Sequence, residues 1–236
     1  GSGVKHAGGN ERAEWVWRQP REGWGRGTGG ALGAGRVRAS ANWDHPDPGR
    51  GTVYVFDLFG GKQLHKLKAN NGQAGDGFGA CLAAADGRVL IGAPNSDQGP
   101  VEDLGKAFLF DLDTGAELAF IPPPANIAEY DRFGSAVAQA DGLLVVSAPG
   151  ADAAGLDLGS VHLFDAQSRA HLGEFARWGL QDGDRFGTRL AASGSRVVVG
   201  VPFADDAGSG SGKAPPFCRW RDLGQPYRGP PHPHPT

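Results

Sequence analysis

The chain of 236 residues carries a formal charge of −3 and contains 40 glycines and 17 prolines. No apolar run approaches the roughly 20 residues that a membrane-spanning helix requires, and the near-neutral charge argues against a nucleic-acid partner. The apolar residues occur in short blocks between glycines and prolines, a pattern typical of all-β proteins. Cys81 and Cys218 lie far apart in the sequence, which argues against a disulfide framework and against a cysteine zinc site.

A repeat of about 54 residues organises the sequence between residues 22 and 206. Phe-Gly pairs begin at Phe78, Phe133 and Phe186, and a small-small-Pro element begins 14 residues after each phenylalanine. A third element, an apolar strand ending in Phe-Asp, recurs in the same phase at residues 53–57, 107–111 and 161–165. The resulting units span residues 22–67, 76–120, 131–175 and 184–206. The first unit is degraded, and the last lacks the third element.

Each unit is predicted to form four short antiparallel strands. The first strand begins at Phe-Gly, and Asp86-Gly87 or Asp141-Gly142 favours a hairpin turn after it, because both turn residues need a positive φ. The second strand is a continuous apolar run, which indicates burial on both faces, and we expect it to be the innermost strand. Four antiparallel strands repeated radially form a blade of a β-propeller. The predicted fold class is therefore all-β, a partial β-propeller of about four units.

The recurring motifs resemble the FG-GAP repeat of the integrin α-subunit head and of many surface proteins. The resemblance rests on Asp-x-Phe-Gly and Gly-Ala-Pro, which begin at Asp76 and Gly92 and recur in phase from Asp131 and Asp184. It covers residues 50–206 well and implies a propeller that mediates binding. The calcium loop of integrin-type repeats does not carry over, because here a two-residue hairpin joins strands one and two. Such a hairpin cannot supply the roughly six to eight oxygen ligands that calcium takes.

Two arrangements of the chain ends are considered. Propellers have about four to eight blades, so the chain is either part of a longer propeller, which we favour, or a four-bladed one. Residues 1–21 are expected to be disordered or to supply a closing strand, at residues 14–18, to the last unit. Residues 207–236 are rich in glycine, proline and histidine and are expected to form a disordered tail.

Candidates for ligand binding lie in two sets of loops on one face of the predicted propeller. The loops between strands two and three are acidic, and those before the Phe-Gly pairs carry aromatic residues. The candidates are Asp97, Asp103, Tyr130, Asp152, Asp157, Trp178, Asp205 and Asp206. Aromatic loop residues on a rigid scaffold are common recognition anchors. The alternatives are packing between blades for the aromatic residues and solvated turns for the carboxylates.

Asp152 and Asp157 are also candidates for calcium binding, although their spacing is not that of an EF-hand. No other cofactor is expected.

Other repeated aspartates are interpreted as structural. Those two residues before Phe-Gly are expected to cap the incoming loop by accepting backbone N–H groups; they are Asp76, Asp131 and Asp184. Those at the end of strand three are expected to initiate turns; they are Asp57, Asp111 and Asp165.

Catalytic motifs are absent from the sequence, which has no GxSxG, HExxH or P-loop pattern. His162 replaces an aromatic residue of the repeat and is interpreted as a packing residue. Residues 110–118 also resemble the Asp-x-x-Thr-Gly-x-x-Leu repeat of quinoprotein dehydrogenases, which implies pyrroloquinoline quinone as a cofactor. That enzyme, and a structural propeller within a larger surface enzyme, are the alternatives to the main hypothesis. The main hypothesis is a non-catalytic adhesion or recognition module, extracellular or on the cell surface, that binds a protein or a glycan.

Overall fold

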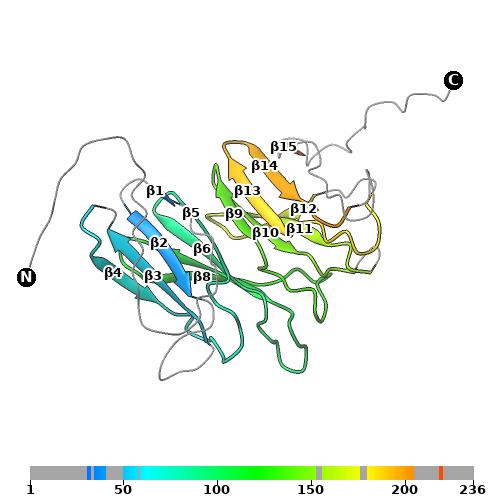
Figure 1. Cartoon of the computed structure of the whole chain (residues 1–236), viewed down its shortest axis with the longest axis horizontal. Helices are drawn as coiled ribbons and strands as arrows, with labels where there is room; N and C mark the ends of the chain where they lie inside the picture. The colour runs from blue at the N-terminus through cyan, green and yellow to red at the C-terminus, as the bar shows by residue number, and fades with distance from the viewer. Residues whose placement is uncertain are drawn as a thin grey trace, which may run out of the picture.

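A computed structural model describes residues 31–32, 35–40, 50–57, 59–152, 156–175, 180–204 and 218–219. Within these ranges the chain forms fifteen β-strands and no helix, and the strands make four antiparallel sheets (Figure 1). The all-β prediction is therefore confirmed. In every sheet the strands lie side by side in chain order, and the strands of sheets I to III follow the first three repeat units.

The four sheets are named I to IV in chain order. Sheet I contains β1 (Ala31–Leu32), β2 (Gly35–Ser40), β3 (Thr52–Asp57) and β4 (Gln63–Leu67). Sheet II contains β5 (Cys81–Ala85), β6 (Arg88–Ala93), β7 (Lys106–Asp111) and β8 (Glu117–Ile121). Sheet III contains β9 (Val137–Ala140), β10 (Leu143–Ala148), β11 (Ser160–Asp165) and β12 (His171–Glu174). Sheet IV contains β13 (Arg189–Ser193), β14 (Arg196–Gly200) and β15 (Cys218–Arg219).

The hairpins between the first and second strands follow the predicted turn chemistry. Asp86 and Gly87 have φ of 51° and 69°, and Asp141 and Gly142 have φ of 49° and 74°. These left-handed conformations match the twist of the flanking strands. The turns set the register that buries the second strands β6 and β10.

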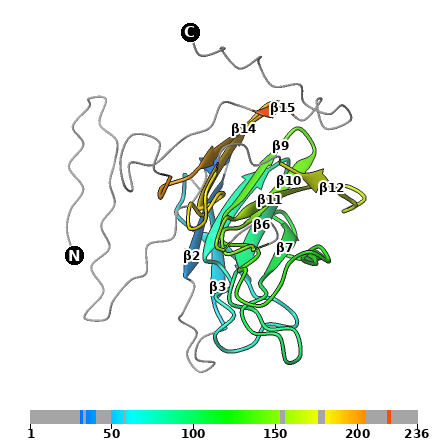
Figure 2. The ribbon, with the colours of Figure 1, turned by 90° about the vertical axis from the view of Figure 1, so that its right-hand side faces the viewer.

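The prediction that the second strand is innermost was wrong. In each sheet the second strand lies between the first and the third, and the first strand is an edge strand. Outside its own sheet, the edge strand β9 contacts mainly the first strands of the two neighbouring sheets, β5 and β13 (Figures 1 and 2). Their alanine-rich sequences allow this approach, because small side chains bring neighbouring backbones close together.

Three apolar clusters fill the interfaces between successive sheets. Sheets I and II share a cluster that contains Val53 and Phe78, sheets II and III one that contains Phe133, and sheets III and IV one that contains Phe186. The Phe-Gly phenylalanines are all buried there. Phe133 meets Phe164 edge to face at a centroid distance of 6.0 Å. The repeat motif therefore supplies one aromatic core residue to each interface.

One element lies where a disordered tail was expected. The short strand β15 pairs with β14 as the third strand of sheet IV. The sequence concealed it because residues 218–219 lack the Phe-Asp pattern of the third strands, whereas the unpaired backbone edge of β14 accepts another strand. The proposed closing segment, residues 14–18, lies outside the described residues, as do most of the two terminal regions.

Candidate functional site

The two sets of candidate loops meet at the junctions between neighbouring sheets. At the junction of sheets II and III, named the II–III junction, backbone N–H groups of Tyr130, Arg132 and Phe133 donate to backbone oxygens of the preceding sheet's loop. The acceptors are Glu102, Asp103 and Leu104, at 3.1, 3.1 and 3.0 Å. A continuous run of backbone hydrogen bonds thus joins the loop after β6 to the loop before β9.

The junction of sheets III and IV, named the III–IV junction, repeats this ladder. Gly183, Arg185 and Phe186 donate to Leu156, Asp157 and Leu158, at 2.8, 3.0 and 2.8 Å. The same segments of the repeat therefore form the same connection twice.

A glycine follows the acceptor residues at each junction, and both of these glycines have a positive φ. Gly105 has φ of 82°, and a Cβ there would lie 2.0 Å from the carbonyl oxygen of Phe133. Gly159 has φ of 84°, and its Cβ would lie 2.3 Å from that of Phe186. Only glycine satisfies both the backbone conformation and the close approach of the next unit.

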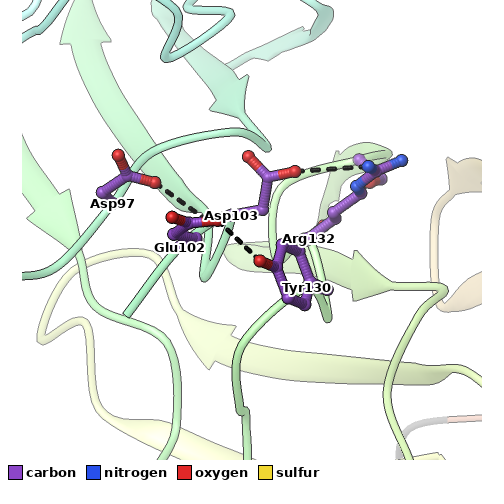
Figure 3. A network of polar contacts seen from close by, with 6 residues as sticks. Asp97, Glu102, Asp103, Tyr130 and Arg132 are labelled. Carbon is purple, nitrogen blue, oxygen red and sulfur yellow. Dashed lines mark hydrogen bonds and ion pairs between the residues drawn. The ribbon is translucent and has the colours of Figure 1, made fainter. Parts of the chain in front are cut away.

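The candidate carboxylates are held by the loops that contain them. Asp97 accepts the backbone N–H of Asp103 at 2.9 Å, and the Asp103 carboxylate pairs with Arg132 at 3.2 Å (Figure 3). In the next unit Asp152 accepts the N–H of Asp157. The Asp157 carboxylate pairs with Arg185 at 2.8 Å. These contacts favour a structural role for the four aspartates, and they reveal two arginines that the sequence did not single out.

Tyr130 differs from its repeat equivalents. It has φ of 65°, whereas the other units place Gly75 and Gly183 at this position, with φ of 98° and 87°. A left-handed backbone costs a non-glycine residue about 1–2 kcal/mol. Despite this cost the position holds a tyrosine, and the residue is 52% exposed.

The Tyr130 hydroxyl is fixed by one contact. It donates to Glu102 Oε2 at 2.6 Å, as Figure 3 shows. This hydrogen bond to a carboxylate raises the pKa of Tyr130 to about 12, so that the phenol is protonated at neutral pH. Glu102, like the two arginines, was not among the predicted binding residues, and its repeat equivalent is the exposed Leu156.

The three aspartates before the Phe-Gly pairs cap the incoming loops, as predicted. Asp76, Asp131 and Asp184 are buried, and each accepts the backbone N–H of the residue three positions earlier, at 2.7–2.8 Å. Burial raises the pKa of Asp131 to about 6, and the nearby carboxylates of Asp152 and Asp157 act in the same direction.

The aspartates that end the third strands initiate turns, also as predicted. Asp111 accepts the backbone N–H groups of Asp113 and Thr114 and the Thr114 hydroxyl, which together lower the pKa of its carboxyl group. Asp165 is held in the same way by Ser168. The resemblance to the quinoprotein repeat therefore coincides with a turn motif.

His162 is fully buried in sheet III. Its Nε2 lies 2.8 Å from Ser160 Oγ, and its Nδ1 lies 3.3 Å from His171 Nε2. The ring also packs 6.0 Å from Phe133. Ser160 is buried as well, and the burial and ring contact of His162 confirm its interpretation as a packing residue.

Three candidates, Trp178, Asp205 and Asp206, lie outside the described residues. Two residues before Asp205 in the sequence, the half-exposed Phe203 lies under the Arg185 guanidinium, whose Cζ is 5.6 Å from the centroid of the phenylalanine ring. The sequence pattern gave no signal for Phe203.

In the part of the chain that the structure describes, no three acidic, histidine or cysteine residues cluster as metal ligands. Calcium binding by Asp152 and Asp157 stays a prediction. The described residues also contain no helix long and apolar enough to cross a membrane.

Comparison with known proteins identifies the repeat. The model of the FG-GAP repeat matches residues 62–110, 124–164 and 180–214, which together make up more than half of the chain. These segments contain the Phe-Gly pairs and the loops of both junctions. A search among curated proteins finds no match to the chain. The chain belongs to the FG-GAP repeat family.

Proposed function

We propose that the chain is a non-catalytic recognition module in which the four sheets are blades of a partial β-propeller. Its ligand, a protein or a glycan, binds to the loops of the II–III junction, and the module works outside the cell or on its surface in adhesion. Membership of the FG-GAP repeat family and the successive antiparallel sheets support the propeller.

Tyr130 is the observation that carries the proposed binding site. The other units show that glycine meets the backbone requirement at this position, so folding does not require the tyrosine ring. A half-exposed aromatic ring, held by its hydroxyl on Glu102, offers an apolar face at little cost in side-chain entropy.

The polar groups around the ring can orient a ligand. Glu102 and Arg132 lie beside the tyrosine in Figure 3, and the Arg132 side chain is half exposed. Aromatic and arginine side chains are enriched among the residues that dominate binding energies. A peptide or a sugar ring that stacks on Tyr130 would find both a hydrogen-bond acceptor and a cation at its edge.

The experiment screens the wild-type chain against an array of immobilised glycans and a phage-displayed library of random peptides. The selected ligands are then measured with Tyr130→Gly, which keeps the backbone conformation, and with the control Leu172→Ala, which truncates a similarly exposed residue on β12. We expect Tyr130→Gly to weaken binding at least about tenfold, or about 1.4 kcal/mol, and Leu172→Ala to leave it unchanged.

Ligands whose affinity does not change in Tyr130→Gly would show that the binding site lies elsewhere. Turnover of an alcohol with a redox dye after addition of calcium and pyrroloquinoline quinone would contradict the non-catalytic assignment and favour the quinoprotein alternative.

A further inference from the structure

The outward face of sheet IV is exposed where the equivalent faces of sheets II and III are buried. The residue 12 positions after each Phe-Gly phenylalanine lies on the face that meets the next sheet; these residues are Leu90, Val145 and Val198. Leu90 and Val145 are fully buried, whereas Val198 is 39% exposed. The sheet IV face therefore has the construction of an interface that lacks its partner.

The neighbours of Val198 extend this surface. Ala191, Arg189 and Arg196 are exposed on β13 and β14. A shallow hollow of about 460 Å³ lies beside them, and residues 191–196 and Val198 line it. We call this surface, made by Arg189, Ala191, Arg196 and Val198, the tail face.

The opposite end of the described structure carries a complementary surface. In sheets II and III, two aromatic residues of the third strand face the preceding sheet and are buried. They are Phe108 and Phe110 in sheet II, and His162 and Phe164 in sheet III. In sheet I the same positions hold Tyr54 and Phe56, which are only partly buried, with ring centroids 6.3 Å apart. We call the surface made by Tyr54 and Phe56 the head face.

A polar contact of the interface between sheets II and III also has a counterpart on the tail face. The Arg88 guanidinium, at the start of β6, donates across the interface to the backbone oxygen of Ala166 in the turn after β11, at 3.2 Å. Arg196 begins β14 at the same position of the repeat, and it is exposed. The tail face thus presents Val198 and Arg196 at the positions where sheet II uses Leu90 and Arg88 to contact sheet III.

We propose that the tail face binds the head face of a second copy of this chain. Because each copy carries one head face and one tail face, two copies can make two identical head-to-tail contacts around a twofold axis. The eight sheets of such a dimer are within the range of about four to eight blades in propellers. The contact covers exposed strands at both ends of the row of sheets, and it is separate from the Tyr130 surface.

Light scattering coupled to size-exclusion chromatography tests the dimer over protein concentrations from 1 to about 100 µM. We expect the wild-type chain to reach twice its monomer mass of 24.5 kDa. Val198→Asp and Arg196→Glu on the tail face, and Tyr54→Asp on the head face, are each expected to weaken dimerisation at least tenfold. Leu118→Asp is the matched control, because Leu118 on β8 is 40% exposed and belongs to neither face, and it is expected to dimerise like the wild type.

Circular dichroism checks that each variant is folded. If Val198→Asp does not fold, Arg196→Glu still tests the tail face, because it replaces a polar residue that is exposed. A mixture of Val198→Cys and Tyr54→Cys chains, treated with diamide as the oxidant, adds a direct readout, because the proposal expects a mixed disulfide between the two new thiols. Each variant oxidised alone shows what the native Cys81 and Cys218 contribute. A monomeric wild type at all concentrations would overturn the proposal, as would a dimer that survives the tail-face substitutions or is lost in Leu118→Asp. If Val198→Cys is a monomer and its new thiol reacts with a maleimide more slowly than an exposed cysteine does, the proposal would also be overturned. A segment of the same chain would then cover the tail face.

Discussion

The II–III and III–IV junctions have the same backbone ladder, a glycine at the same position and the same arginine–aspartate pair, but a hydrogen-bonded tyrosine and glutamate occur at the II–III junction and not at the III–IV junction. Tyr130 and Glu102 are bonded at the first junction, and the equivalent residues at the second are Gly183 and Leu156. What the junctions share follows from the requirement to hold successive sheets together. The III–IV junction forms without an equivalent of this side-chain contact, which supports the proposal that the Tyr130 surface serves recognition.

The largest expected effect concerns the shared glycines. Gly105→Ala and Gly159→Ala should each reduce the free energy of unfolding by about 3 kcal/mol or more, because the new Cβ clashes with the next unit's backbone in addition to adopting a left-handed conformation. Gly142→Ala is the matched control, since Gly142 has φ of 74° and its Cβ would meet no atom within 4 Å. It should cost only about 1–2 kcal/mol. Urea unfolding measures all three, and similar losses for all of them would show that the junction contacts are not required.

An effect on the order of 2 kcal/mol is expected from pH at the II–III junction. Since the pKa of Asp131 is raised from 3.8 to about 6, the folded chain holds this proton more tightly than the unfolded chain. The stabilisation from this proton is therefore complete below pH 3.8 and is lost as the pH rises through 6.

Asp131→Asn retains an acceptor for the Ala128 N–H and does not titrate. We expect the variant to gain stability relative to the wild type as the pH rises from about 4 to 6, in urea titrations at each pH. A difference that stays constant over this range would contradict the raised pKa.

The arginine–aspartate pairs should contribute less. Double-mutant cycles with alanine for Arg132 and Asp103, and for Arg185 and Asp157, should each give a coupling of about 0.2–1 kcal/mol, because at least one partner of each pair is half exposed. The coupling should fall when the salt concentration is raised from about 0.01 to 1 M. A coupling above about 2 kcal/mol at either junction would show that the two pairs are not equivalent surface contacts.

The repeat phase predicted much of the fold, because each phenylalanine and each Asp-Gly turn has a local conformational requirement that the sequence displays. The innermost strand could not be predicted in this way, since both β5 and β6 are apolar and only the packing of edge strands distinguishes them. The strand β15 was missed because its pairing depends on the open edge of β14 and not on its own pattern.

The candidate site was predicted in part. The two sets of loops that the sequence singled out meet at the junctions, and Tyr130 was chosen for its aromatic ring. Its contact with Glu102 could not be foreseen, because the two residues are 28 positions apart and meet only through the ladder. Alignment of the repeat units does contain a usable signal, since a tyrosine stands where two units have glycine.

The most direct test of the assignment of Tyr130 to recognition is the thermal unfolding of Tyr130→Gly beside the wild type. The substitution relieves a left-handed backbone and removes one exposed hydrogen bond, two effects of about 1 kcal/mol each and of opposite sign. We therefore predict a melting temperature that is unchanged within about 3 °C or is higher. A decrease of more than about 6 °C, which corresponds to a loss of roughly 2 kcal/mol or more, would show that Tyr130 holds the II–III junction together and would contradict the account.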